Sequence, residues 1–433
     1  MKNCDLIIHG ASQLLTCASN GKPKRGLQMQ DVGLIEDGAV AVSDGKILAA
    51  GKTDDILREY ESENFFDARG KTVAPGFVEC HTHIVFAGNR LGEFELKIKG
   101  ADYLEILRAG GGILSTVRQT RAASLSELVE QSRRRLDKML ALGVTTCEVK
   151  TGYGLDTETE LKMLEAILAL DESHSVDLIP TFLPAHAVPS ADFEAEGLSK
   201  EEAAERYTQI VCDEMLPAAA KIKERNEKFK DCFFVDVFCE KGAFNLEQSR
   251  KVLETAKWLG FKLKAHVDEF TNLGGARMAI ELGAVSIDHL DAISDEEINL
   301  LADSETVGVV TPTVNFNFGS KEFADARKLI DRGCAVAIST DYNPGSAPCP
   351  SLPNAMAIAC RYQKLLPGEA FNATSINAAF AAGIGERAGS LEAGKQADIT
   401  IFDTPDFREI AYEFGGNPVE TVFKNGKVIY GKK

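Results

Sequence analysis

The segment ECHTHIVFAG at residues 79–88 places two histidines one residue apart at the end of an apolar run. This run, TVAPGFVECHTHIVF, is rich in β-favouring residues, which predicts a buried strand. Because successive side chains on a strand point to opposite faces, His81 and His83 would share one face, about 6.5 Å apart along the chain. Two imidazoles at this spacing can converge on one small object, and a metal ion is the obvious candidate.

Other polar residues that could join such a site follow strand-like runs later in the chain: Lys150, Tyr153, His186, His266, His289 and Asp341. A His-x-His pair alone is equally compatible with core histidines held by hydrogen bonds. Combined with His266 and Asp341, in the order that would encircle a barrel mouth, the pair predicts a metal site. Three imidazoles and one carboxylate suit Zn²⁺ or Fe²⁺, and the residue types do not choose between these ions.

The elements that must position these residues follow an alternating pattern. Apolar strand-like runs alternate with amphipathic helical segments such as 124–143 and 157–171. Eight such runs in about 300 residues predict an α/β fold of the (β/α)8 TIM barrel class, with the active site where the strands end. The eight runs are 76–84, 144–150, 176–183, 233–239, 262–267, 284–290, 307–313 and 334–340.

Both ends of the chain have a different pattern, in which short strand-like runs are separated by turns. An Asn-Gly pair at Asn425 and Gly426 is a hairpin signal within the C-terminal part. Because neither end could bury a core alone, we expect one small composite β-sandwich domain from residues 1–75 and 388–433. The catalytic barrel would then occupy residues 76–387. The glycine-rich stretch at 108–114 lacks the strand and helix of a phosphate-binding loop and is interpreted as a turn.

Composition limits the possible partners and the compartment. A formal net charge of −17 argues against nucleic acid, and it means that an anionic substrate would need a local basic anchor. The apolar stretches are too short to cross a membrane or to act as a secretory signal. Ten scattered cysteines without a CxxC pair indicate free thiols in a reducing cytoplasm.

Several longer motifs carry a resemblance that covers nearly the whole chain. They are HTHIVFAGNR at 81–90, KTGYGLDTETE at 150–160, PAHAVP at 184–189, VFCEKGAF at 237–244, HVDEFT at 266–271 and STDYNPGSAP at 339–348. The chain thereby resembles the amidohydrolase superfamily and, more narrowly, the imidazolonepropionases of histidine degradation. That family opens the cyclic amide of 4-imidazolone-5-propanoate with water to give N-formimidoyl-L-glutamate. The resemblance also implies a homodimer and a small anionic substrate.

The resemblance assigns roles to individual residues. It implies that one divalent metal ion, Zn²⁺ or Fe²⁺, is held by His81, His83, His266 and Asp341. Catalytic roles would fall to Glu269, His289 and Asp341. Substrate contacts would come from Arg90, Tyr153, His186, Glu269, Asn343, Gly345 and Ser346. Residue 342 is Tyr where the resemblance leads us to expect Phe, and this difference replaces none of the expected metal ligands.

We expect one metal ion, because the lysine that bridges two ions in related enzymes has no counterpart at the end of strand four. Lys241 lies beyond Glu240, and Lys150 belongs to strand two, where it is interpreted as a loop lysine or an ion-pair partner.

The expected chemistry is attack of a metal-activated water on the cyclic amide. Arg90 would bind the propionate, Glu269 and Asp341 would move protons, and His289 would stabilise the oxyanion. Alternatively, Arg90 and Glu269 are solvated surface residues and His289 is a core histidine. Two other functions stay open: a guanine- or cytosine-deaminase-like aminohydrolase, and a non-catalytic assembly protein that kept the fold.

Overall fold

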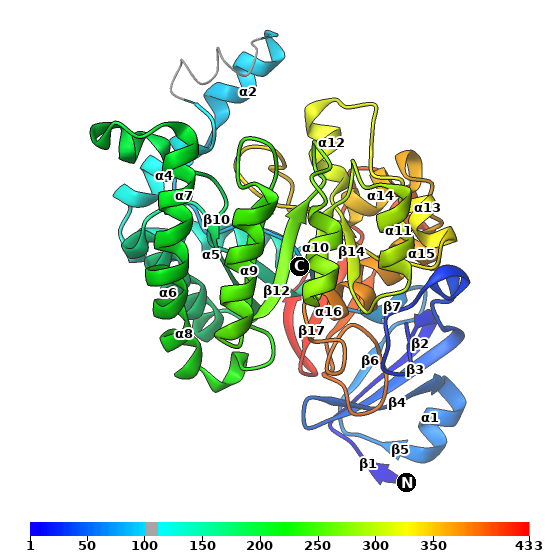
Figure 1. Ribbon diagram of the computed structural model, residues 1–433. Helices are drawn as coiled ribbons and strands as arrows, with labels where there is room; N and C mark the ends of the chain where they lie inside the picture. The colour runs from blue at the N-terminus through cyan, green and yellow to red at the C-terminus, as the bar shows by residue number, and fades with distance from the viewer. Residues whose placement is uncertain (101–110, 433) are drawn as a thin grey trace.

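A computed structural model describes residues 1–100 and 111–432, and Figure 1 shows two β-sheet regions side by side. The larger region holds a sheet surrounded by helices, and the smaller region holds strands from both ends of the chain. The glycine-rich stretch 108–114 lies partly outside the described residues; its described part leads into helix α4 (Ile113–Ala122).

The larger sheet has eight parallel strands in the order β8 to β15, so each strand pairs with the next one along the chain. All eight runs expected from the sequence are strands. They are β8 (Phe77–Glu79), β9 (Val144–Lys150), β10 (Asp177–Ala185), β11 (Phe234–Cys239), β12 (Lys262–Val267), β13 (Ser286–His289), β14 (Val307–Val310) and β15 (Ala335–Ile338). The eight-stranded parallel sheet fits the expected TIM barrel.

The first and last strands meet through the segments that follow them. A parallel bridge joins Thr82 to Tyr342, and the backbone N–H of His83 donates to the carbonyl of Tyr342 at 3.0 Å. The first strand is shorter than expected, since β8 ends at Glu79 and both histidines lie in the extended segment beyond it. This segment makes single hydrogen bonds to its neighbours in place of a regular ladder.

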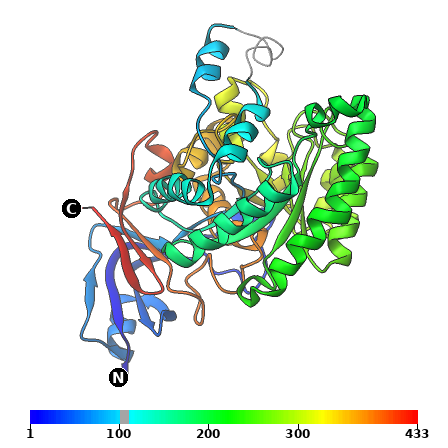
Figure 2. The same ribbon diagram turned by 90° about the vertical axis from the view of Figure 1, so that its left-hand side faces the viewer.

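Helices cover the outer face of this sheet, as the two views in Figures 1 and 2 show. Helix α5 (Leu125–Leu140) begins at a capping box formed by Ser124 and Glu127, and its buried stripe includes Leu128 and Leu136. Further helices are α6 (Thr157–Ser173), α7 (Lys200–Ile210), α8 (Leu216–Glu224), α9 (Leu246–Trp258), α10 (Gly275–Leu282), α11 (Asp295–Ala302), α12 (Pro312–Phe318), α13 (Ala326–Asp331), α14 (Leu352–Tyr362), α15 (Pro367–Thr374) and α16 (Ile376–Ala381). Helix α2 (Leu91–Ile98) extends from the top of the barrel in Figure 1.

The smaller region joins the two chain ends in one sheet. Strand β7 (Thr72–Pro75) pairs antiparallel with β16 (Ile399–Phe402), with Val73 opposite Ile401. The sheet order is β18-β17-β16-β7-β2-β3-β4, with β6 beside β2. The remaining bounds are β2 (Leu6–Leu15), β3 (Leu34–Ser43), β4 (Lys46–Lys52), β6 (Phe65–Asp67), β17 (Val419–Lys424) and β18 (Lys427–Gly431). A composite sheet was expected, and its arrangement as a sandwich stays a prediction.

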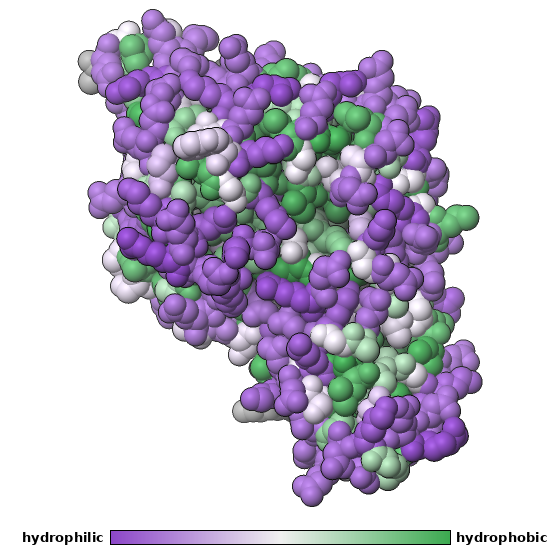
Figure 3. Space-filling view, turned by 60° about the horizontal axis from the view of Figure 1, so that its bottom comes forward, coloured by the Kyte–Doolittle hydropathy of each residue, from purple (hydrophilic) through white to green (hydrophobic). Residues whose placement is uncertain are grey.

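The hairpin predicted by the Asn-Gly pair is confirmed. Asn425 and Gly426 form the turn between β17 and β18, with φ of 49° and 73°, the left-handed backbone that a two-residue hairpin requires. All ten cysteines are free thiols. Within the described residues, no helix combines the length and apolarity needed to cross a membrane. Figure 3 shows polar side chains over most of one face, with apolar ones gathered near its centre and over the composite sheet.

Candidate metal centre and active site

Histidines from separate strand ends meet at one buried point of the barrel. His81 and His83 follow β8, while His266 and His289 belong to β12 and β13. The rings of His81 and His266 lie 4.5 Å apart between centroids, and those of His266 and His289 lie 5.2 Å apart. The sequence-based expectation that these residues gather is therefore confirmed.

The expected ligand set has the spacing of a coordination sphere. The Nε2 atoms of His83 and His266 are 3.3 Å apart. Two nitrogens bound tetrahedrally to Zn²⁺ at 2.0–2.1 Å are about 3.3 Å from each other. Oδ1 of Asp341 lies 3.6 Å from Nε2 of His81 and 3.5 Å from Nε2 of His83.

The buried atoms at this point also lack other partners. Among the described residues, Nε2 of His81 and Oδ1 of Asp341 have no hydrogen-bond partner. A buried polar group without a partner is costly, so these atoms are placed as if for a cation. His81, His83 and Asp341 offer ligand atoms within 4.8 Å of one another, as do two sets of three histidines that contain His266. The donor set therefore fits a divalent metal ion.

The protonation states suit metal binding. Burial, followed by Lys150 and the neighbouring imidazoles, holds the pKa of His81 well below its usual range. Burial and nearby histidines likewise lower the pKa of His83. Both rings are therefore neutral near pH 7 and can offer a nitrogen lone pair. Asp341 has a φ of 49°, a strained backbone for a non-glycine residue, and residues in such conformations cluster at functional sites.

Two buried carboxylates orient two of these histidines from behind. Oδ2 of Asp288 lies 2.6 Å from Nδ1 of His81, and Oδ2 of Asp236 lies 3.0 Å from Nδ1 of His266. A carboxylate hydrogen-bonded to a histidine fixes which ring nitrogen carries the proton and leaves Nε2 free to bind a metal, as Asp288 does for His81. The contact of Asp236 with Nδ1 of His266 lacks hydrogen-bond geometry. Sequence reasoning missed both residues; the available signal was an acidic residue inside each of two buried strands, β11 and β13.

Lys150 is the last residue of β9, and its side chain is fully buried. Its Nζ lies 2.8 Å from both Glu148 and Asp236. The interpretation as an ion-pair partner is therefore confirmed, whereas the alternative of a loop position is wrong.

His186 and Tyr153 lie beside the histidine cluster. The ring of His186, directly after β10, stacks on His83 with centroids 4.8 Å apart and 14° between planes. Nδ1 of His186 lies 3.0 Å from the carbonyl of Gly152, which orients the ring. Tyr153 is buried, with its ring centroid 5.8 Å from that of His83. Both residues are placed to contact a molecule held at the cluster.

Glu269 and His289 form a second pair close to the cluster. Oε2 of Glu269 is 3.8 Å from Nε2 of His289, and Nδ1 of His289 lies 3.1 Å from the hydroxyl of Thr311. Burial, reinforced by Asp341, raises the pKa of Glu269 well above its usual range. This carboxyl group can therefore carry a proton near neutral pH, which suits a general acid. Glu269 is thus a largely buried carboxyl rather than a solvated surface residue.

Arg90 lines a cavity whose lining residues include none of the clustered histidines. Its guanidinium donates to Oε2 of Glu93 at 2.6 and 2.9 Å, and Oε1 of Glu93 accepts the backbone N–H of Gly112. This cavity, of about 490 Å³, is lined by Arg90 together with Asn343 and Gly345. Arg90 is therefore paired and partly buried, not a solvated surface arginine.

Asn343, Gly345 and Ser346 form the loop after Asp341. The carbonyl oxygen of the Asn343 side chain accepts the N–H groups of Gly345 and Ser346, both at 2.8 Å. Its amide donates to the carbonyl of Asp341 and to Oγ of Ser346, both at 2.7 Å. The Asn343 side chain thus organises the loop that carries Asp341.

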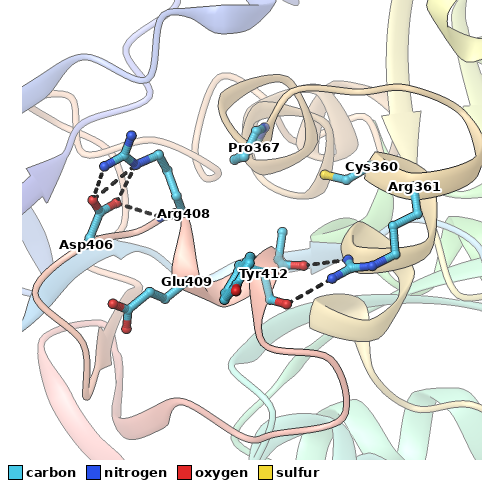
Figure 4. A pocket seen from close by; sticks show the side chains of 8 residues that line it. Cys360, Arg361, Pro367, Asp406, Arg408, Glu409 and Tyr412 are labelled. Carbon is cyan, nitrogen blue, oxygen red and sulfur yellow. Dashed lines mark hydrogen bonds and ion pairs between the residues drawn. The ribbon is translucent and has the colours of Figure 1, made fainter.

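Another cavity, of about 540 Å³, lies between α14, α15 and the short helix α17 (Glu409–Tyr412) (Figure 4). Its two guanidinium groups already have partners. Arg361 donates to the carbonyls of Ala411 and Tyr412, and Arg408 pairs with Asp406. None of the clustered histidines lines this cavity, so the candidate active site is at the strand ends.

Comparisons with known proteins agree with this fold. The sequence model of the amidohydrolase family matches residues 72–429. A protein from Chloroflexus aggregans named imidazolonepropionase is 50% identical over 431 residues, which cover 99% of each chain. A protein of the same name from Herpetosiphon aurantiacus is 48% identical and covers 99% of this chain and 98% of its own.

Similar solved structures include an adenosine deaminase from Xanthomonas campestris with bound zinc, at a TM-score of 0.71 and 20% identity. It is matched over 99% of this chain and 93% of its own. A guanine deaminase from E. coli matches over 99% of both chains, with a TM-score of 0.70 and 16% identity. At these identities, the structural likeness concerns the fold alone.

Proposed function

The chain belongs to the amidohydrolase family and, within it, to the imidazolonepropionases, and we propose that it hydrolyses 4-imidazolone-5-propanoate at the buried histidine cluster. The product would be N-formimidoyl-L-glutamate. Identity of 44–50% over nearly the full length of eight relatives with this name carries the proposal. The clustered ligand atoms supply a chemical reason for it.

His81, His83, His266 and Asp341 would hold one divalent metal ion, Zn²⁺ or Fe²⁺. Such an ion, when bound, makes water acidic enough to act as a nucleophile near neutral pH and polarises a carbonyl oxygen. Because their pKa values are low, His81 and His83 would bind the ion without first having to lose a proton. The exclusion of water by the buried rings strengthens every electrostatic interaction at this point.

Arg90 would bind the propionate group of the substrate. A guanidinium pairs with a carboxylate through two parallel hydrogen bonds, which gives both affinity and orientation. This local cation offsets the repulsion that a net charge of −17 exerts on an anion. Since the guanidinium of Arg90 forms an ion pair with Glu93, the propionate would either displace Glu93 or bind Arg90 beside it. Tyr153 and His186 would contact the substrate, and Asn343, Gly345 and Ser346 would line its far side.

Glu269 would donate the proton that the leaving ring nitrogen needs. Its raised pKa keeps a proton available, and a general acid of this kind contributes roughly 10²–10⁴ in rate. His289, 3.8 Å away, would stabilise the negative charge that develops on the carbonyl oxygen. Asp341 would accept the proton of the attacking water. Burial favours the protonated form of this carboxyl, and the positive charge of the bound ion would favour the carboxylate that this role requires.

Three further features belong to the same proposal. The protein would act in the cytoplasm, its barrel would occupy residues 76–387, and two copies would form a homodimer. Exposed aromatic side chains near α12, α14 and α17 offer an apolar surface for such a contact; they are Phe316, Tyr362, Tyr412 and Phe414. Light scattering of the purified protein tests the homodimer directly.

The decisive experiment is to incubate the metal-replete protein with freshly generated imidazolone propionate and follow the loss of its ultraviolet absorbance. We expect turnover with formation of formimidoyl-glutamate and no release of ammonia. Ammonia release from guanine or cytosine, without imidazolone hydrolysis, would contradict the proposal and favour an aminohydrolase. A protein that binds metal but turns over none of these compounds would favour a non-catalytic role.

A further inference from the structure

Lys150 lies at the centre of a buried charge network behind the histidine cluster. Its side chain is fully buried, and so are the side chains of Glu148, Asp236 and Asp288 around it. Nζ of Lys150 is 2.8 Å from Glu148, 2.8 Å from Asp236 and 3.6 Å from Asp288. Burial alone would lower the pKa of this lysine, but the three carboxylates raise it, so the group is charged.

Two of these carboxylates lead directly to expected metal ligands. The same oxygen of Asp288, Oδ2, lies 2.6 Å from Nδ1 of His81 and 3.6 Å from Nζ of Lys150. Oδ2 of Asp236 accepts from Lys150 and lies 3.0 Å from Nδ1 of His266, a close contact without hydrogen-bond geometry, while its Oδ1 accepts the backbone N–H of His266 at 3.2 Å. One ammonium group therefore reaches two ligand rings, His81 after β8 and His266 in β12, each through one carboxylate.

The third carboxylate leads to the backbone between the first two histidines. Oε2 of Glu148 accepts the N–H of Thr82, which lies between His81 and His83, at 3.2 Å. Its Oε1 pairs with Lys150 and with the hydroxyl of Thr181. Contacts from Lys150 thus extend through one intermediate residue to the segments that carry His81, His83 and His266.

We propose that Lys150 is the positioning residue of the metal centre, which fixes the carboxylates that hold His81 and His266 with Nε2 toward the ion. Without this ammonium group, Asp236 and Asp288 would lose the cation that contacts both of them, and of the lysines only the buried Lys264 would still favour the charged form of Asp288. They would then move apart, and the rings of His81 and His266 would lose the contacts that set their orientation. Loss of one partner behind a ligand typically weakens metal affinity about 10- to 100-fold, and Lys150 supports two such partners.

The chain offers a matched control in Lys424. This buried lysine also joins two aspartates, with Nζ 2.7 Å from Asp398 and 2.8 Å from Asp177. It donates to the carbonyl of Thr145, where β17 approaches the barrel, and within the described residues neither aspartate pairs with one of the clustered histidines. A general cost of removing a buried lysine should therefore appear in Lys424→Gln as well as in Lys150→Gln.

The test measures Zn²⁺ affinity of the full-length protein by competition with a chromophoric chelator, in the absence of substrate. We expect Lys150→Gln to bind Zn²⁺ at least tenfold more weakly than the unaltered protein, and Lys424→Gln to bind it within threefold. Thermal unfolding of the metal-free proteins reports the structural cost of each change separately. Equal Zn²⁺ affinities for Lys150→Gln and the unaltered protein, or equal losses in the two variants, would overturn the proposal.

A second variant keeps the charge and changes its position. Lys150→Arg retains a cation, but its planar fork cannot occupy the same point among three carboxylates. We expect weaker Zn²⁺ binding and a mixture of tautomers for His81 and His266 in nitrogen-15 NMR spectra. If Lys150→Gln does not fold, the Lys150→Arg variant provides the test. A Zn²⁺ affinity within threefold of that of the unaltered protein would show that a buried charge is enough without the position of Lys150, and would overturn the proposal. Because no substrate is used, the outcome is independent of whether imidazolone propionate is turned over.

Discussion

The Nε2 atoms of His83 and His266 lie 3.3 Å apart, although the two residues are separated by 183 positions in the chain. His83 follows the first barrel strand and His266 lies in the fifth, so the closure of the barrel brings them together. Because burial lowers the pKa of His83, its ring is neutral and does not repel a cation. The two nitrogens are close enough for both lone pairs to bind one metal ion.

Metal removal should destabilise the protein and abolish its activity. A ligand present at 1,000 times its dissociation constant stabilises the folded state by about 4 kcal/mol, so chelation should lower Tm measurably. Addition of Zn²⁺ or Fe²⁺ to the chelated protein should restore both Tm and turnover, and comparison of the two ions would identify the effective one. A chelated, metal-free protein with unchanged Tm and turnover would contradict the metal centre.

Replacement of Arg90 should weaken substrate binding more than the chemical step. A hydrogen bond to a charged group contributes about 1.5–3 kcal/mol, so Arg90→Met should raise KM roughly 10- to 100-fold. Arg134→Met on the exposed face of α5 removes an equivalent charge without touching the cavity and serves as the control. Unchanged KM in the Arg90 variant would remove its role as an anchor.

Gly345 sets the space available to the same guanidinium. A Cβ at residue 345 would lie 1.9 Å from Nη1 of Arg90, so Gly345→Ala must displace this flexible side chain. We expect a raised KM for the propionate substrate with little change in Tm. Gly92→Ala on α2 is the control, since a Cβ there meets no atom within 4 Å. Equal KM values for the two variants would show that the guanidinium does not need its present position.

Glu269→Gln should separate proton transfer from metal binding. The amide cannot donate a proton to the leaving nitrogen as an acid does, so kcat should fall by roughly 10²–10⁴. Metal content, measured by atomic absorption, should stay the same because Glu269 is not an expected ligand. Glu281→Gln, an exposed change on α10, should alter neither quantity. Near-normal turnover in the Glu269 variant would assign the proton to another residue.

Asp291 should make the protein less stable as the pH rises. Burial raises the pKa of this carboxyl to about 7, while hydrogen bonds from Asn315 and Ala324 oppose the shift. Since the folded pKa lies above the unfolded value, the stabilising contribution is complete below about pH 4 and is lost as the pH rises to 7. Asp291→Asn does not titrate and keeps the acceptor oxygen.

The Asn variant should therefore gain stability relative to the unaltered protein between pH 5 and pH 8. The gain is on the order of 2 kcal/mol, because one pKa unit corresponds to about 1.4 kcal/mol. Tm measured at both pH values provides the comparison. A Tm difference that is constant across this range would show that the carboxyl does not titrate as expected.

The sequence alone was sufficient for the order of the barrel strands and the gathering of the strand-end histidines. Alternating periodicity marks each element, and the carboxyl ends of parallel strands meet at one rim of a barrel. His266 and His289 could therefore be placed at one site from their positions at strand ends. Motifs such as NPGSAP resemble those of imidazolonepropionases and so indicated which amidohydrolase reaction to expect. The relatives named imidazolonepropionase agree with that expectation.

The tertiary structure decided which groups stand behind the ligands. Asp236 and Asp288 lie on different strands from the lysine that contacts them, and Lys150 is 86 positions from Asp236. No local pattern pairs residues at that separation, because periodicity reports only which face of a strand is buried. The sequence determined the set of chemical groups at the rim. Only the folding of the barrel determined how far apart their nitrogen and oxygen atoms lie, and metal binding depends on those distances.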